Sequence, residues 1–232
     1  MIATTTKNVN HIDRLALKIQ ALNKTKDATS RILIGVSGIP GSGKSTLGEA
    51  VAARLNELEG SDGQFAVCIP MDGYHLSRAQ LAAMHDPATA IHRRGAAFTF
   101  DAEGFYRLVK SLREPLTADS VAVYALSFDH AIKDPVADDI PILPASKIVI
   151  FEGLYLPLNR EPWSLAAALM DESWFIDVDR DIARERLIKR HVASGIVPDV
   201  GAAKHRIDST EFLNANDIME NRLPVDELVP GS

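Results

Sequence analysis

The sequence predicts an α/β fold in three layers, with a mostly parallel five-stranded sheet between two layers of helices. The first observation is a set of short apolar runs, each typical of a strand buried on both faces. They are residues 31–36, 65–69, 147–151 and 174–178, with a shorter run at 226–229. The second is a helical periodicity in the intervals between them, at residues 44–58, 103–112 and 181–194. Strands that alternate with helices form parallel sheets covered on both faces.

Composition narrows the class of protein. The chain has 232 residues and a net charge of −6, which fits one α/β domain and argues against broad nucleic-acid binding. Its only cysteine, Cys68, lies in an apolar run, so no disulfide can form within the chain and a reducing compartment is expected. No segment has the length of a membrane span, and no apolar signal region begins the chain. We therefore expect a cytoplasmic protein that binds neither nucleic acid nor a membrane.

Residues 1–30 are expected to be an N-terminal extension of a single domain at residues 31–232. Residues 1–10 are polar and rich in threonine, which predicts disorder. Apolar residues then recur at helical spacing (Ile12, Leu15, Ile19 and Leu22), so an amphipathic helix is predicted over residues 11–22. We expect this helix to dock on the edge of the domain without a catalytic role.

A phosphate-binding motif follows the first predicted strand. Residues 38–46 read GIPGSGKST, which satisfies G-x-x-x-x-G-K-[ST] between a buried strand and a helix. The glycines let the backbone curl so that successive N–H groups face phosphate oxygens, and the helix points its positive dipole end at the same place. The motif predicts the fold of a P-loop NTPase and a site for ATP and Mg²⁺, built by Gly38, Pro40, Gly41, Ser42, Gly43, Lys44, Ser45 and Thr46.

Two acidic residues directly follow predicted strands. Asp72 comes after the second strand and Glu152 after the third, so both should lie at the sheet edge where the P-loop opens. Asp72 would be the base that accepts the proton of an attacking hydroxyl, or would hold Mg²⁺ through water, although it could instead form the turn before Gly73. Glu152 would hold Mg²⁺ together with the Ser45 hydroxyl.

The helix predicted at residues 181–194 is rich in basic residues. Arg186 and Arg190 share one face of it at a spacing of four. Late in a P-loop chain, such a face typically belongs to a helical lid that neutralises the charge of a transferring phosphoryl group. Lys44, Arg186 and Arg190 are therefore predicted to be catalytic, while a solvated basic face remains the alternative for each arginine.

The loops around the predicted site are expected to bind the acceptor of the phosphoryl group. Residues 117–146 are irregular and rich in Asp and Pro, which is typical of a functional insert. The acidic residues at 134, 138 and 139 are better explained as a solvated loop. The residues predicted to contact the acceptor are Tyr74, His75, Arg93, Arg94, Tyr124, Asp129 and His130.

At this point the chain resembles the phosphoribulokinase/uridine kinase family of P-loop kinases. The resemblance rests on residues 35–46 (GVSGIPGSGKST), 71–75 (MDGYH) and 151–154 (FEGL), and on the arginine-rich late helix. It implies that Asp72 is the base toward the acceptor hydroxyl and that Glu152 is the family's acidic residue after the core strand. Within the family the motifs are most similar to the uridine kinase-like and nucleoside/fructose kinase-like branch. Typical uridine kinases carry Asp-Ser-Phe-Tyr where this chain has DGYH at residues 72–75, and Gly73 is more typical of pantothenate kinases.

The sequence therefore predicts an ATP-dependent kinase that phosphorylates an alcohol group on a nucleoside, a sugar or a pantothenate-like molecule. The alternative is an ATPase switch that acts on a partner protein. No guanine-specific Asn-Lys-x-Asp motif follows the P-loop, and no transporter signature occurs. The oligomeric state is open, with a homodimer as one option.

Overall fold

The computed structural model describes residues 2–62 and 64–231, with side chains from His11 onward. Its helices are α1 (Ile2–Asn23), α2 (Lys44–Glu59), η1 (Met71–Tyr74), α3 (Arg78–Ala82), α4 (Pro87–His92), η2 (Ala97–Thr99), α5 (Ala102–Ser111), α6 (Trp163–Ala167), α7 (Arg180–Ala193), α8 (Val200–Arg206), η3 (Ile207–Glu211) and α9 (Phe212–Asn221). Its strands are β1 (Ile32–Gly38), β2 (Ala66–Pro70), β3 (Val123–Asp129), β4 (Asp134–Ile142), β5 (Ile148–Glu152), β6 (Glu172–Asp177) and β7 (Glu227–Pro230).

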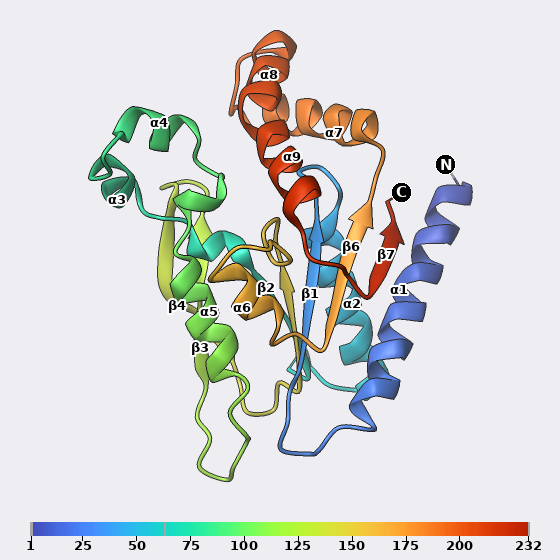
Figure 1. Cartoon of the computed structure of the whole chain (residues 1–232). Helices are drawn as coiled ribbons and strands as arrows, with labels where there is room; N and C mark the ends of the chain where they lie inside the picture. The colour runs from blue at the N-terminus through green and yellow to red at the C-terminus, as the bar shows by residue number, and fades with distance from the viewer. Residues whose placement is uncertain (1, 63, 232) are drawn as a thin grey trace.

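The main sheet confirms the predicted fold class. Within the described residues it has five strands in the order β2-β5-β1-β6-β7, and every pairing is parallel. The register places Val36 of β1 and Pro70 of β2 on either side of Glu152 of β5. The carboxyl ends of these three neighbouring strands therefore meet at one edge, at the upper end of the sheet in Figure 1.

Helices cover both faces of this sheet, as Figure 1 shows. Apolar side chains of β1, β5 and β6 alternate between two cores, as expected for strands buried on both sides. One core lies against α1 and α2, and the other lies against α5, α6 and the β3–β4 hairpin. This rigid scaffold fixes the loops at the carboxyl edge.

Helix α1 begins earlier than the sequence indicates. We expected residues 1–10 to be disordered, but the backbone is helical from Ile2, while Met1 lies outside the described residues. The amphipathic pattern over residues 11–22 is confirmed, because Leu15, Ala16 and Ile19 are fully buried in the core shared with α2.

The segment 117–146 is an antiparallel β-hairpin rather than an irregular insert. Strands β3 and β4 pair from Val123 and Ile142 at one end to Asp129 and Asp134 at the other, with an irregularity between Ala125 and Ser127. The hairpin packs closely on η1. A Cβ placed on Gly73 would lie 2.0 Å from the Leu126 carbonyl oxygen, so only glycine allows this approach.

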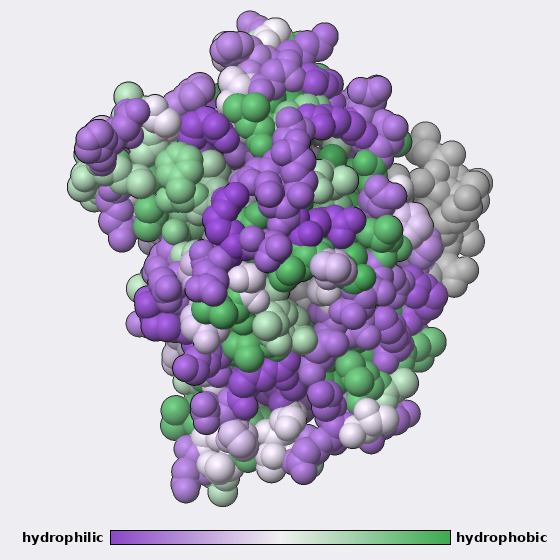
Figure 2. Space-filling model, viewed as in Figure 1, coloured by the Kyte–Doolittle hydropathy of each residue, from purple (hydrophilic) through white to green (hydrophobic). Residues whose placement is uncertain are grey.

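Within the part of the chain that the structure describes, no helix is long and apolar enough to cross a membrane. The face of the molecule drawn in Figure 2 is mostly polar, with separate apolar patches.

Candidate phosphoryl-transfer site

The P-loop joins the end of β1 to the start of α2. Gly41 and Gly43 take the left-handed backbone conformation, with φ of 83° and 93°, and α2 begins at Lys44. The loop is closed by a hydrogen bond of 3.0 Å from the Ser42 N–H to the Ile39 carbonyl. The Ser42 hydroxyl is buried and has no hydrogen-bond partner among the described residues. This unsatisfied hydroxyl at a helix N-terminus is consistent with a cradle built for phosphate oxygens.

Helix α7 packs directly on this loop. A Cβ on Gly41 would lie 2.6 Å from the Ala183 carbonyl oxygen, and Arg186 donates a hydrogen bond of 3.4 Å from Nη1 to the Gly41 carbonyl. A cavity of about 210 Å³ opens between loop and helix, lined by Gly41, Gly43, Lys44, Ser45, Thr46, Arg186, Leu187 and Arg190. The structure therefore brings both predicted arginines and Lys44 to one site.

The two predicted carboxylates lie at the same sheet edge but in different surroundings. Glu152 is only 8% exposed, and burial raises the pKa of its carboxyl. The charge of Lys44 and a hydrogen bond from the Ser45 hydroxyl act in the opposite direction on that pKa, while the charge of Asp72 adds to the increase. Asp72 lies in η1 directly after β2, and its side chain is 51% exposed.

The residues at this edge fit a magnesium ion. Ser45 and Glu152 offer hard oxygen ligands, and the Ser45 hydroxyl acts to lower the pKa of the Glu152 carboxyl. Across residues 2–62 and 64–231, no group of three or more His, Cys, Asp and Glu side chains could hold a metal by itself. This arrangement suits Mg²⁺, which usually takes one or two protein ligands and fills its other positions with phosphate oxygens and water.

His75 lies beside the predicted base. Its Nε2 atom is 3.8 Å from Oδ1 of Asp72, and its ring stacks on Phe100 at a centroid distance of 4.0 Å. Burial lowers the pKa of His75 to about 4, although Asp72 acts to raise that pKa, so the ring is neutral at pH 7. The predicted position of His75 at the acceptor side is consistent with this geometry.

Arg93 reaches from the end of α4 to α9. Its Nη2 atom donates a hydrogen bond of 3.0 Å to Oδ1 of Asn214. Next to this pair, the Tyr155 hydroxyl donates to the Gly95 carbonyl at 3.1 Å. Arg160 and Asp217 form an ion pair of 3.0 Å between the segment after β5 and α9. Arg160, Tyr155 and Asp217 could not be predicted from the sequence, because only the fold brings these distant segments together.

Two of the residues predicted to bind the acceptor make structural contacts within the fold. Tyr74 is 2% exposed and packs edge-to-face on Phe105 in the apolar core, and burial raises its pKa to about 12. Arg94 donates hydrogen bonds to the Leu76 carbonyl at 2.8 Å and to the Lys133 carbonyl at 2.6 Å. It therefore ties the hairpin to the segment after η1.

The three hairpin residues predicted for the acceptor site lie in different surroundings. Asp129 stabilises the hairpin turn, because its Oδ1 accepts hydrogen bonds from the N–H groups of Ala131 and Ile132. Tyr124 is 49% exposed and pairs with Pro141 near the opposite end of the hairpin, so its contact with the acceptor stays a prediction. His130 packs on Phe128 at 5.2 Å and acts to lower the pKa of His75, which places it closer to the site.

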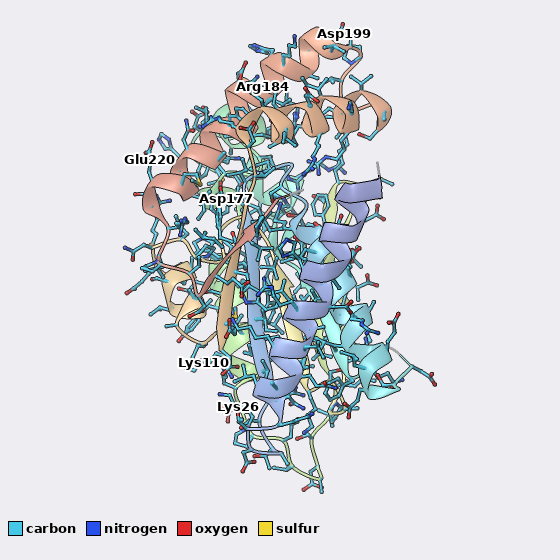
Figure 3. All side chains as sticks on the ribbon, turned by 90° about the vertical axis from the view of Figure 1, so that its right-hand side faces the viewer. Lys26, Lys110, Asp177, Arg184, Asp199 and Glu220 are labelled. Carbon is cyan, nitrogen blue, oxygen red and sulfur yellow. The ribbon has the colours of Figure 1, made fainter. Side chains whose placement is uncertain are left out.

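Helices α7, α8 and α9 form a connected layer above the P-loop (Figures 1 and 3). Arg184, labelled in Figure 3, pairs with Asp208 at 2.7 Å, and its guanidinium lies over the ring of Phe212 at 4.5 Å. Inside this layer, the buried His191 lies 2.9 Å from Glu211. Arg184 is therefore held by η3 and α9, whereas Arg186 and Arg190 line the cavity at the P-loop.

Comparison with known proteins agrees with this geometry. The profile of the phosphoribulokinase / uridine kinase family matches residues 33–195. The chain is 75% identical over 162 residues to the ATP-dependent kinase-like protein notR' of Aspergillus versicolor, covering 70% of this chain and 94% of that one. It is 42% identical over 196 residues to a protein named as a candidate uridine kinase, C227.14, of Schizosaccharomyces pombe (84% and 81% covered).

A solved structure has the same fold. The crystal structure of a protein named as a candidate fructose transport system kinase, from Silicibacter sp. TM1040, superposes with a TM-score of 0.79. It is 33% identical, over 93% of this chain and 98% of that one. The fold, the P-loop site and these matches lead to one conclusion: the chain belongs to the phosphoribulokinase / uridine kinase family of ATP-dependent P-loop kinases.

Proposed function

We propose that the chain transfers the γ-phosphoryl group of ATP to an alcohol group of a small molecule. The observation that carries the proposal is the composition of a single sheet edge. Lys44, Arg186 and Arg190 line the phosphate cavity, Asp72 follows β2, and Glu152 is the last residue of the adjacent strand β5. Phosphoryl transfer needs little more than positioning, charge neutralisation and a group that accepts the hydroxyl proton.

Each side chain then has a specific task. Lys44 and the two arginines neutralise the charge of the phosphoryl oxygens, where preorganised cations act most strongly. Ser45 and Glu152 would hold Mg²⁺, which supplies further positive charge at the phosphates when bound. Asp72 accepts the proton of the attacking hydroxyl, because its side chain is exposed at the mouth of the site.

The acceptor side favours a small polar molecule. Arg93 with Asn214, and Arg160 with Asp217, supply hydrogen-bonding groups on segments that meet next to the site. Such groups recognise hydroxyl-rich molecules. The names of the relatives mention uridine and fructose, and both a nucleoside and a sugar are consistent with these side chains.

The proposal is tested by coupled ADP release with Mg²⁺ and ATP against nucleosides, simple sugars, glycerate and pantothenate. We expect ADP release to depend on one class of acceptor and to disappear in Lys44→Ala. ADP release that proceeds at the same rate with and without every acceptor would instead support an ATPase switch. The same assay with candidate partner proteins would then identify what the switch acts on.

A further inference from the structure

A second cavity, of about 280 Å³, lies beside the P-loop and is partly built by the N-terminal helix. His11 and Ile12 of α1 line one side of it, and Val229 of β7 lines another. Thr46 and Leu47 at the start of α2 complete the floor. None of the roles proposed above uses α1 or β7.

This cavity adjoins the phosphate site. Gly43, Thr46 and Arg186 line both cavities, so a nucleotide with its phosphates in the P-loop has room for its nucleoside in the second one. The walls combine the apolar side chains of Ile12, Leu47 and Val229 with few polar groups. Apolar walls with a few polar groups are typical of sites that bind a flat aromatic ring.

Helix α1 is fixed firmly enough to serve as a wall. Leu15, Ala16 and Ile19 are fully buried against the core that contains α2. Asp13 pairs with Arg54 of α2 at 2.7 Å. Basic residues of α1 also form ion pairs with acidic residues of β6 and β7, and these pairs hold the helix in place.

Ion pairs also join α1 to β7, and both elements line the cavity. Lys18 lies 3.3 Å from Glu227 at the start of β7 and 2.6 Å from Glu172 of β6, and Arg14 pairs with Glu227 as well. Figures 1 and 3 show α1 running alongside the β7 edge of the sheet, with α7 above them. The position of His11 and Ile12 relative to the P-loop is therefore set by the fold.

We propose that α1 is part of the nucleotide site: His11 and Ile12 form the wall on which the purine base of ATP packs. The inference rests on the proposed use of ATP. It predicts that α1 determines affinity for the base and ribose, while the P-loop and α7 determine affinity for the phosphates.

The test compares two ligands by calorimetry in the presence of Mg²⁺: ATP, and inorganic tripolyphosphate, which has no base. In the variant with both His11→Ala and Ile12→Ala, we expect the Kd for ATP to increase about tenfold, because apolar contacts to the base are lost. The Kd for tripolyphosphate should stay within about twofold of the wild type, which also shows that the variant is folded. Leu17→Ala is the matched control, since Leu17 is on the same helix but 52% exposed, and it should change neither Kd.

The outcomes separate this inference from the proposed function. Unchanged ATP affinity in the double variant would overturn the role of α1 while leaving the kinase assignment intact. Equal losses for ATP and tripolyphosphate would also overturn it, because α1 would then support the P-loop rather than the base. Failure of the wild-type protein to bind either ligand would overturn the proposed function, and this inference with it.

Discussion

Two carboxylates at the ends of neighbouring strands differ in their surroundings, and this difference separates their roles. Glu152 is buried beside Ser45 and Lys44, where a cation would compensate its charge. Asp72 is exposed at the mouth of the same edge, where an acceptor molecule can reach it. The buried carboxylate therefore suits Mg²⁺, and the exposed one suits proton transfer.

Replacing Asp72 by Asn tests the second assignment. We expect kcat to fall by about 10²–10⁴, the usual contribution of a general base, with the Kd for ATP unchanged. The measurement is acceptor-dependent ADP release together with calorimetric ATP binding. Asp139→Asn, which changes an exposed residue of β4, is the control and should keep full activity. Wild-type turnover in Asp72→Asn would remove this residue from the mechanism.

Glu152→Gln should stabilise the ligand-free protein while abolishing activity. The folded-state pKa of Glu152 is raised above its ordinary value of 4.5, so the stability linked to this group is complete below that pH and is lost as the pH rises through the folded-state pKa. The amide in the variant carries no charge, so the variant does not lose this stability as the pH rises. We expect a higher Tm than the wild type at pH 7 and a smaller difference at pH 5. A lower Tm at pH 7 would show that the carboxylate is stabilising as it stands.

His75 should make the stability of the fold depend on pH. Its folded-state pKa of about 4 lies below the ordinary 6.5, so its contribution is complete above pH 6.5 and is lost as the pH falls toward 4. At pH 5 the loss is about 2 kcal/mol, from about 1.4 kcal/mol per pH unit. The groups that face the ring are Asp72, which raises its pKa, and Arg94 and His130, which lower it.

The variant that measures this effect is His75→Phe, which keeps an aromatic ring to stack on Phe100. Denaturant unfolding of the wild type and the variant between pH 7 and pH 5 gives the difference directly. We expect the wild type to lose more unfolding free energy than the variant over this range. Parallel pH dependences would mean that His75 is not held neutral in the folded protein.

At the level of elements, the contact between the P-loop and α7 positions the arginines. Gly41→Ala should shift α7, because the added Cβ meets the Ala183 carbonyl at 2.6 Å and the residue has a φ of +83°. We expect a loss of about 1–3 kcal/mol in stability and weaker binding of ATP, with a higher Kd.

Gly60→Ala is the matched control, with a φ of +66° and no atom within 4 Å of the added Cβ. It should cost about 1 kcal/mol and leave ATP binding unchanged. Equal ATP affinity in both variants would contradict the positioning role of this contact.

The core strands could be predicted from the sequence because strands buried on both faces form continuous apolar runs. The β3–β4 hairpin could not, because β4 contains Pro135 and Pro141 and several aspartates, which disfavour strands in general. A two-stranded hairpin tolerates prolines, since its outer edge leaves N–H groups unpaired. Its packing on Gly73 is a tertiary contact that no local pattern indicates.

The candidate site was predictable to a similar extent. Residues 38–46, Asp72 and Glu152 lie at or directly after strand ends, so the sheet alone brings them together. Arg186 and Arg190 follow from helical spacing. The roles of Arg94, Tyr124 and Asp129 depend on how the hairpin packs, and those of Asn214 and Asp217 depend on how α9 crosses the molecule.

At the level of the whole molecule, α1 and β7, which lie far apart in the sequence, meet beside the phosphate site. Lys18 of α1 and Glu227 of β7 form one of the ion pairs that close this side, and the P-loop lies between it and the acceptor side formed by η1, α4 and α9. We therefore expect a donor nucleotide and an acceptor to bind on opposite sides of one sheet edge. That arrangement is the central claim of the proposed function.

The most direct test uses ATP labelled with ¹⁸O in its γ-phosphoryl group, incubated with the protein, Mg²⁺ and each acceptor that stimulates ADP release. Mass spectrometry then locates the label. We predict an acceptor that is phosphorylated on one of its own hydroxyl groups, and the new phosphoryl group carries the three labelled oxygens. Little labelled inorganic phosphate should form. Label recovered only as inorganic phosphate, at a rate independent of the acceptor, would contradict the account and identify an ATPase instead.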